Sequence, residues 1–227
     1  MTDFANAIKK PFSDMKNLGI GVVLGAIPIV NMLTVYGYGI NCAKHADKKS
    51  LPKWEDIVPH ITTSIIAIVI ALVYMIPAII VGLFMAGPLI DTLVSSMTNM
   101  NEIMDPMVLT NMLGTIAIGI IPFVLLVLIA AFFLPLALTR YALKGKIGEA
   151  FAFGKIIKRA LTGEYIITLI VYIGYAFIVG IILGILMGIL NIIPVLDSII
   201  GMLLGGFGMY ISYVTGYTLF GQLKWKD

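Results

Sequence analysis

The segment GAIPIVNM, residues 25–32, interrupts the first apolar stretch of the chain with a proline and, three residues later, an asparagine. A similar phrase, NIIPVLDS at residues 191–198, places an aspartate three residues after its proline. Proline lacks the N–H that a helix interior needs, so helices bend or end there, whereas Asn and Asp favour the N-cap of a new helix. Both phrases therefore predict a turn between two helices. The residues of these helix-turn tips are Pro28, Asn31, Pro194 and Asp197.

The composition around these tips is that of a polytopic membrane protein. Of the 227 residues, 60% are hydrophobic and 12% are charged, and the mean hydropathy is +1.04. A soluble domain of this length needs a larger polar surface, and a spanning helix needs about 20 apolar residues. We therefore predict a single all-α membrane domain over residues 1–227, a helical bundle with four full spans. The spans are expected at 61–87, 113–139, 165–190 and 198–222.

The basic residues indicate how these spans are oriented. All fifteen Lys and Arg residues lie in the N-terminus, the 44–60 loop, the 140–164 loop or the C-terminal tail. Segment 88–112 carries only acidic charges. Because cytoplasmic loops are enriched in Lys and Arg, we expect the basic loops and the C-terminus in the cytoplasm, and 88–112 and the turn at 191–197 outside. The expected location is the cell (plasma) membrane.

Segment 17–43 does not fit this alternation, because basic residues flank it on both sides. It is too short for two full spans and long enough for one. In one interpretation, GAIPIVNM is the tip of a re-entrant hairpin, and both flanks are cytoplasmic. In the other, the segment is a single kinked fifth span, and the N-terminus lies outside. The repeated phrase favours the hairpin, and the sequence leaves both alternatives open.

Two further segments have the pattern of amphipathic helices that lie on the membrane surface. In residues 1–16, apolar side chains recur every four residues beside lysines. In the 140–164 linker, one apolar face is opposed by Glu149, Lys155 and Arg159. The residues of this apolar face are Ile147, Ala150, Phe151, Ile157 and Leu161. Helices of this kind bind anionic headgroups at the cytoplasmic leaflet. The expected membrane-surface residues of the linker are Lys155, Lys158 and Arg159.

Rows of glycine mark the last two predicted spans. Small residues four apart let membrane helices approach closely, so that dispersion forces hold them together. Because the two rows flank a single turn, we expect them to pack the last two spans into a tight hairpin. Homodimerisation through the same faces is the alternative. The residues of these rows are Gly180, Gly184, Gly188, Gly201 and Gly205.

Tyrosines follow one face of the last predicted span. Tyr210, Tyr213 and Tyr217 are spaced by three and four residues, so they share a side of the helix. Their hydroxyl groups need partners inside a bilayer. Interhelical hydrogen bonds and interfacial anchoring satisfy that need, and a polar cavity that also includes Tyr36 is the alternative.

The sequence lacks the usual machinery of membrane catalysis. No predicted span contains Asp, Glu, Lys, Arg or His, which proton relays and intramembrane metalloenzymes need at depth. His45 and His60 match no ligand spacing, and we expect them in a solvated loop, where Trp54 anchors the chain at headgroup level. The net charge of +3 is too small to indicate nucleic acid. We therefore expect no enzyme activity, no catalytic residue, no cofactor and no metal.

Three stretches resemble a known family. They are VYGYGINCAKHAD followed by LPKWEDI, then GEAFAFGKIIKRALTGEY, then IPVLDSIIGML followed by VTGYTLFGQLKW. These stretches are similar to an uncharacterised prokaryotic membrane family, frequent in archaea, in the domain-of-unknown-function series under the number four-zero-one-three. The resemblance covers nearly the whole chain. It implies no activity and assigns no functional residue.

Two functions are compatible with these features. The first is a non-enzymatic multi-pass protein that organises lipid or partner proteins, including further copies of itself, and it rests on the surface helices and glycine rows. The alternative is a small permease or channel for a neutral or lipid-like solute. It rests on the broken first segment, because discontinuous helices build many transport sites.

Overall fold

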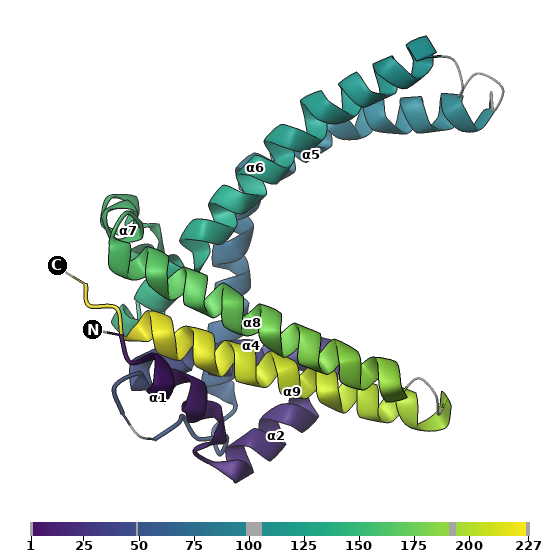
Figure 1. The fold of residues 1–227 in the computed structure, drawn as a ribbon. Helices are drawn as coiled ribbons and strands as arrows, with labels where there is room; N and C mark the ends of the chain where they lie inside the picture. The colour runs from purple at the N-terminus through teal and green to yellow at the C-terminus, as the bar shows by residue number, and fades with distance from the viewer. Residues whose placement is uncertain (1, 49, 99–105, 191–193, 226–227) are drawn as a thin grey trace. The chain divides into compact units, whose positions relative to one another are not determined.

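The computed structural model describes residues 2–48, 50–98, 106–190 and 194–225, and every regular element in these ranges is a helix (Figure 1). Four of the helices are long and apolar enough to cross a membrane. The predicted all-α membrane bundle with four spans is therefore confirmed. The candidate spans are Val58–Pro88, Ile120–Lys144, Gly163–Leu190 and Ser198–Gly221.

The first two long helices extend beyond the predicted spans. Helix α5 covers Val58–Thr98 and α6 covers Pro106–Lys144. Most of the segment expected as a polar loop is thus helical, and residues 99–105 lie outside the described residues. Pro77 and Pro88 both remain inside α5, because a proline removes one hydrogen bond without ending a long apolar helix.

The end of α6 corrects the predicted start of the linker. Residues 140–144 still belong to α6, and the helix stops at Gly145, whose φ of 70° is in the left-handed region that glycine adopts most readily. The linker itself contains the 3-10 helix η3, Ile147–Phe151, and the short helix α7, Phe153–Ala160. The single surface helix expected over 140–164 is therefore two short helices that meet at Ala152.

The chain divides into two compact units, residues 1–70 with 135–227, and residues 71–134. The second unit is a pair of antiparallel helical segments from α5 and α6 (Figure 1). In this pair Gly82 leaves room for the ring of Phe123, since an added Cβ would lie 3.3 Å from it. The first unit contains the remaining helices and both cavities discussed below.

The first apolar segment is broken into short helices. After α1, Phe4–Lys9, and η1, Lys10–Phe12, come α2, Met15–Gly25, and α3, Pro28–Leu33. The segment ends with α4, Val35–Cys42, and η2, Ala43–His45. The chain is interrupted at residues 26–27 and again at Thr34.

The predicted capping role of Asn31 and Asp197 is wrong. Pro28 is the first residue of α3, and Asn31 lies inside that helix. Pro194 likewise begins α9, Pro194–Gly221, and Asp197 lies in its first turn. Proline is well suited to the first helical position, where its missing N–H has no partner to lose. In both phrases the proline itself therefore starts the new helix.

The broken segment runs along α9 and returns, as Figure 1 shows for α2 and α4 beside α9. On the outward path α2 meets α9 at Gly25, where an added Cβ would lie 2.9 Å from the carbonyl oxygen of Gly206. On the return path Gly39 faces Tyr213, and Ala43 faces Gly221 at the end of α9. The segment thus forms a hairpin that turns near the middle of α9, which is the geometry of the re-entrant alternative.

Lys10 closes the base of this hairpin. Its amino group is buried, and the side chain is 2% exposed. The Nζ atom donates to three carbonyl oxygens. They belong to His45, to Ala46 (3.3 Å) and to Lys48 (2.8 Å). The two flanks of the hairpin are therefore tied together at the same end of α9.

Helices α8, Gly163–Leu190, and α9 lie side by side (Figure 1), but four of the five glycines in the predicted rows do not make this contact. Gly208 faces Leu183, and Gly216 faces the ring of Tyr172. The three glycines of the predicted row in α8 have open space beside them in the described part of the chain. The same is true of Gly205 in α9. The pattern identified helices rich in glycine, but only the register decides which glycines face a neighbour. The residues with open space are Gly180, Gly184, Gly188 and Gly205.

A hydrophobic core of the first unit forms where the 44–60 loop packs against the hairpin and α9. Trp54 is 8% exposed and stacks on Tyr38 with ring centroids 4.1 Å apart and an interplanar angle of 4°. Its indole N–H donates to the carbonyl oxygen of Asn17 at 3.1 Å. Trp54 is therefore a core residue and not the expected headgroup anchor. A stacked aromatic pair stabilises a fold by about 0.5–1.5 kcal/mol beyond its buried area.

Candidate functional site

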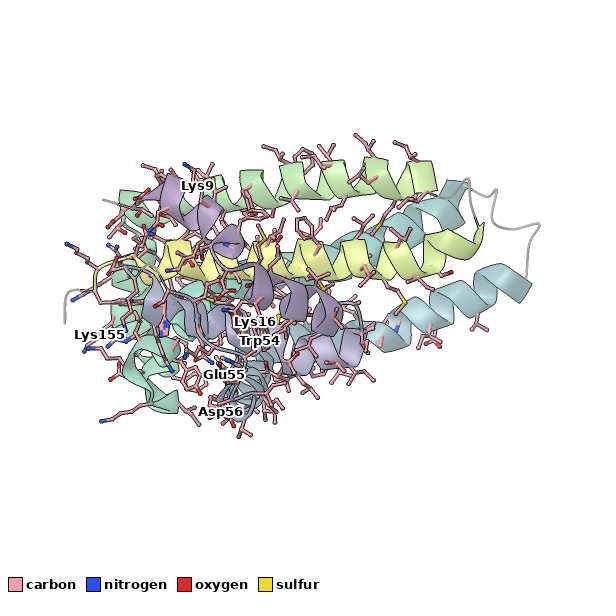
Figure 2. All side chains as sticks on the ribbon, turned by 90° about the horizontal axis from the view of Figure 1, so that it is seen from below. Lys9, Lys16, Trp54, Glu55, Asp56 and Lys155 are labelled. Carbon is pink, nitrogen blue, oxygen red and sulfur yellow. The ribbon has the colours of Figure 1, made fainter. Side chains whose placement is uncertain are left out.

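A cavity of about 610 Å³ lies at the end of the first unit where α9 ends. Figure 2 shows Lys155, one of its lining residues, at this end of the α8–α9 pair. Four of the lining side chains are cationic and one is a carboxylate. The cavity is therefore a strongly basic site. It is lined by Lys155, Lys158, Arg159, Thr162, Glu164, Lys224 and Trp225.

Three elements build this basic cavity. Helix α7 supplies the three residues predicted from the linker, and they do come together in one site. The turn between α7 and α8 supplies Thr162, whose hydroxyl accepts from the backbone N–H of Tyr165 at 3.4 Å and so caps α8. The residues after α9 supply Lys224 and Trp225. The cavity thus joins segments that are far apart in the sequence.

Among the described residues that line the cavity, Glu164 is the only carboxylate, and it is paired with Arg159. The guanidinium Nη2 lies 2.6 Å from Oε2 of Glu164, and the Arg159 side chain is 12% exposed. The other carboxylate oxygen accepts a long hydrogen bond of 3.5 Å from the hydroxyl of Thr2. A half-buried ion pair therefore fixes the direction of the arginine at the cavity wall.

Arg140 holds the walls of the cavity in place. Its side chain is 1% exposed and lies 2.5 Å from a carboxylate oxygen of Glu149 in η3. The same guanidinium lies 4.8 Å from the ring centroid of Trp225, in cation–π geometry. One buried cation at the end of α6 thus connects the linker to the C-terminal tail.

One exposed face of α7, continued by its C-cap Leu161, is apolar. Phe153, Ile157 and Leu161 follow one another at intervals of four residues and are 53%, 43% and 71% exposed. Ile156 and Ala160 lie about 100° further round the helix and are buried against the protein. The sequence correctly grouped Ile157 with Leu161, but the full apolar face includes Phe153 in place of the residues of η3.

The predicted tyrosine face is filled by aromatic rings. Tyr36 contacts Tyr213 with ring centroids 5.3 Å apart and Tyr217 at 6.3 Å. Tyr210 is fully buried and lies 5.8 Å from the ring of Tyr38. The four tyrosines therefore come together with the hairpin, and neither of the two cavities described here is lined by them.

A second cavity of about 380 Å³ lies beside the start of the hairpin. It includes Lys16, Trp54 and Glu55, which Figure 2 labels close together. Two acidic and two basic side chains line it, so its charges balance. It resembles a solvated cleft more than a site for an ion.

His60 does not lie in a solvated loop as expected. It is 4% exposed in the first turn of α5, where its ring contacts Nδ2 of Asn41 at 3.1 Å and the carbonyl oxygen of Lys53 at 3.1 Å. His45 is only half-buried. Within the described ranges no group of three or more His, Cys, Asp or Glu side chains is arranged to hold a metal ion.

Sequence reasoning misses Glu164 and Trp225, which line the basic cavity, and the supporting residue Arg140, which the sequence places in a loop. The contact between Arg140 and Trp225 depends on the fold, since these residues belong to different helix ends. Glu164 lies only five residues from its partner Arg159. The cluster of cations around 155–159 was the signal that sequence alone could give.

Comparison with known proteins identifies the family and no function. A family model described as "Protein of unknown function (DUF4013)" matches residues 20–192. No curated protein and no solved structure gave a match. The matched region includes the hairpin from residue 20 onward, the linker and three of the four candidate spans. The chain therefore belongs to this family of membrane proteins of unknown function.

Proposed function

We propose that this protein is a non-enzymatic multi-pass protein of the plasma membrane that organises anionic lipid at the cytoplasmic surface. In this proposal the C-terminus and the basic loops are cytoplasmic, as the positive-inside rule favours. The observation that carries it is the outer face of α7, where exposed apolar side chains lie beside a basic cavity. Its partner is membrane lipid.

The two parts of this surface attract a membrane through different forces. Burial of Phe153, Ile157 and Leu161 among lipid chains contributes roughly 25 cal/mol for each Å² removed from water. Each nearby Lys or Arg adds on the order of 1 kcal/mol when the leaflet is anionic. Together they favour anionic over zwitterionic lipid around this end of the molecule.

The proposal is tested by measuring which lipids surround the protein. The full-length chain is reconstituted into vesicles of phosphatidylcholine and phosphatidylglycerol, and then extracted with its adjacent lipid in styrene–maleic acid particles. We expect the phosphatidylglycerol fraction in these particles to exceed that of particles made from protein-free vesicles. Substitution of Phe153, Ile157 and Leu161 by serine is expected to reduce the excess. Equal fractions with and without protein contradict the proposal.

The hairpin supports a second candidate, a permease or channel for a neutral solute. Asn31 lies near the turn of the hairpin, is 4% exposed, and its Oδ1 has no hydrogen-bond partner among the described residues. Broken helices with exposed polar ends build many transport sites. Swelling of proteoliposomes in glycerol, compared between wild type and Asn31→Leu, tests this candidate. Swelling rates no faster than those of empty liposomes rule it out for that solute.

A further inference from the structure

The charges around the basic cavity point to an anion as its occupant. Four cations face one carboxylate in a volume of about 610 Å³, which is within the range of about 300–1,000 Å³ typical of small-molecule sites. Because Glu164 already pairs with Arg159, Lys158 and Lys224 contribute to the excess positive charge of the described lining. A phosphate group matches the charge, and the volume leaves room for the rest of a small ligand that carries it.

The start of α8 adds to this preference. Thr162 and Glu164 line the cavity, and α8 begins between them at Gly163. The backbone N–H groups at the start of a long helix carry a partial positive charge, and anions bind there in many proteins. The helix start and the lysine side chains therefore favour the same kind of ligand in the same place.

Glu164 is the internal competitor for such a ligand. It occupies Arg159 at 2.6 Å, and a guanidinium binds a carboxylate or a phosphate through the same pair of donors. A bound phosphate draws Arg159 away from Glu164 or shares it. The carboxylate therefore lowers the affinity of the cavity for anions, and its removal is expected to raise that affinity.

The apolar face of α7 indicates where the phosphate comes from. Lys155 and Lys158 of the cavity lie on the same short helix as the exposed side chains of Phe153 and Ile157. A helix whose apolar face enters the headgroup region holds its basic residues at the depth of lipid phosphates. We infer that the cavity binds the phosphate of one anionic lipid headgroup as a single saturable site. This inference rests on the proposed function and adds a specific site to it.

Trp225 provides a native reporter for the test. The test uses a full-length Trp54→Phe variant, in which Trp225 is the only tryptophan. This variant is placed in phosphatidylcholine nanodiscs that contain an increasing fraction of phosphatidylglycerol. The emission of Trp225 is expected to change and then saturate. Lys158→Gln and Lys224→Gln are each expected to raise the half-saturating fraction about threefold to tenfold. Glu164→Gln is expected to lower it.

The matched control is Lys146→Gln, which removes the same charge from an exposed lysine outside the cavity. We expect it to move the half-saturating fraction by less than about twofold, as surface charges contribute little. Equal effects of Lys146→Gln and Lys158→Gln overturn the single site. If the extraction experiment still shows excess phosphatidylglycerol in that case, the proposed function stands without it.

A second arm separates lipid from soluble phosphate esters. Glycerol 3-phosphate is added to the same protein in pure phosphatidylcholine nanodiscs. We expect no saturating change in Trp225 emission at millimolar concentrations, because the soluble ester lacks the acyl chains that hold a headgroup beside α7. The same saturating change with glycerol 3-phosphate overturns the assignment to lipid.

Discussion

Lys10 lies in a segment whose sequence pattern is that of a basic surface helix, yet its amino group points into the protein. It donates to carbonyl groups at residues 45–48, more than 30 residues away in the chain. Lys9, its neighbour, is exposed. Two adjacent lysines with the same local sequence therefore have different roles, and only the tertiary contacts distinguish them.

We expect Lys10→Met to destabilise the hairpin by about 2–3 kcal/mol, because the charged donor is lost and buried carbonyl groups are left without a partner. The effect is measured as a lower thermal unfolding temperature in detergent and as faster proteolysis within residues 43–50. Lys9→Met is the matched control and is expected to change neither. Equal effects of the two substitutions contradict the assigned role of Lys10.

His45 lies at the same base of the hairpin and gives it a pH dependence. Burial lowers the pKa of the His45 imidazole, and the positive charges of Lys48, Lys10 and Lys44 lower it further. The His45 imidazole therefore binds a proton less readily in the folded state than in the unfolded chain. Its contribution to the free energy of unfolding is fully present above the ordinary pKa of 6.5 and decreases as the pH falls below that value. The hydrogen-exchange rate of residues 43–48, corrected for its intrinsic pH dependence, is expected to rise between pH 7.5 and 5.5. His45→Asn is expected to abolish that rise.

At the scale of elements, long apolar runs predicted the four spans well, because burial in lipid dictates helix and length together. The positions of caps and contact glycines were predicted poorly. A proline three residues before Asn31 or Asp197 is compatible with either a cap or a helix start. Likewise a glycine row shows that one face of a helix is narrow without showing whether a neighbour lies against it.

Two adjacent glycines of α9 allow a direct test of the contact between α2 and α9. An added side chain at Gly206 meets backbone atoms of Ala26 at 2.6 Å and Gly25 at 2.8 Å, whereas Gly205 has open space in the described structure. We expect Gly206→Val to cost about 1–3 kcal/mol through overpacking and to release the hairpin from α9. Gly205→Val introduces the same side chain one position away and is expected to leave thermal stability nearly unchanged. Similar melting temperatures for the two variants contradict the close contact.

At the scale of the whole molecule, the hairpin places residues 2–12 and the end of α9 together, as the hydrogen bond of 2.6 Å between Asp3 and Gln222 shows. Basic residues on both flanks of the first apolar segment predicted this return, because both flanks prefer the same side of a membrane. The basic cavity could be predicted only in part. Its α7 residues and Glu164 are close in sequence, whereas Lys224 and Trp225 join them only through the packing of α8 on α9.

The topology is tested with single cysteines in a Cys42→Ala background. Ala5 and Lys48 are exposed on the two flanks of the hairpin, and Asp91 is exposed in α5. We expect an impermeant thiol reagent to label Asp91→Cys in intact cells, because the proposed topology places the acidic segment outside. Ala5→Cys and Lys48→Cys are expected to react only after lysis. If the reagent labels Ala5→Cys but not Lys48→Cys in intact cells, the two flanks lie on opposite sides of the membrane, and the hairpin is contradicted.

The contact between Asn31 and Met209 joins residues 178 positions apart, and it has a consequence for biosynthesis. The first 45 residues leave the ribosome long before the helix that covers them is made. At about 5–20 residues per second this interval is on the order of ten to forty seconds. During that time the glycine-rich surfaces of α2 and α4 have no α9 to pack against. The hairpin segment is therefore synthesised well before the helix that covers it, and it cannot reach its final place until α9 has been made.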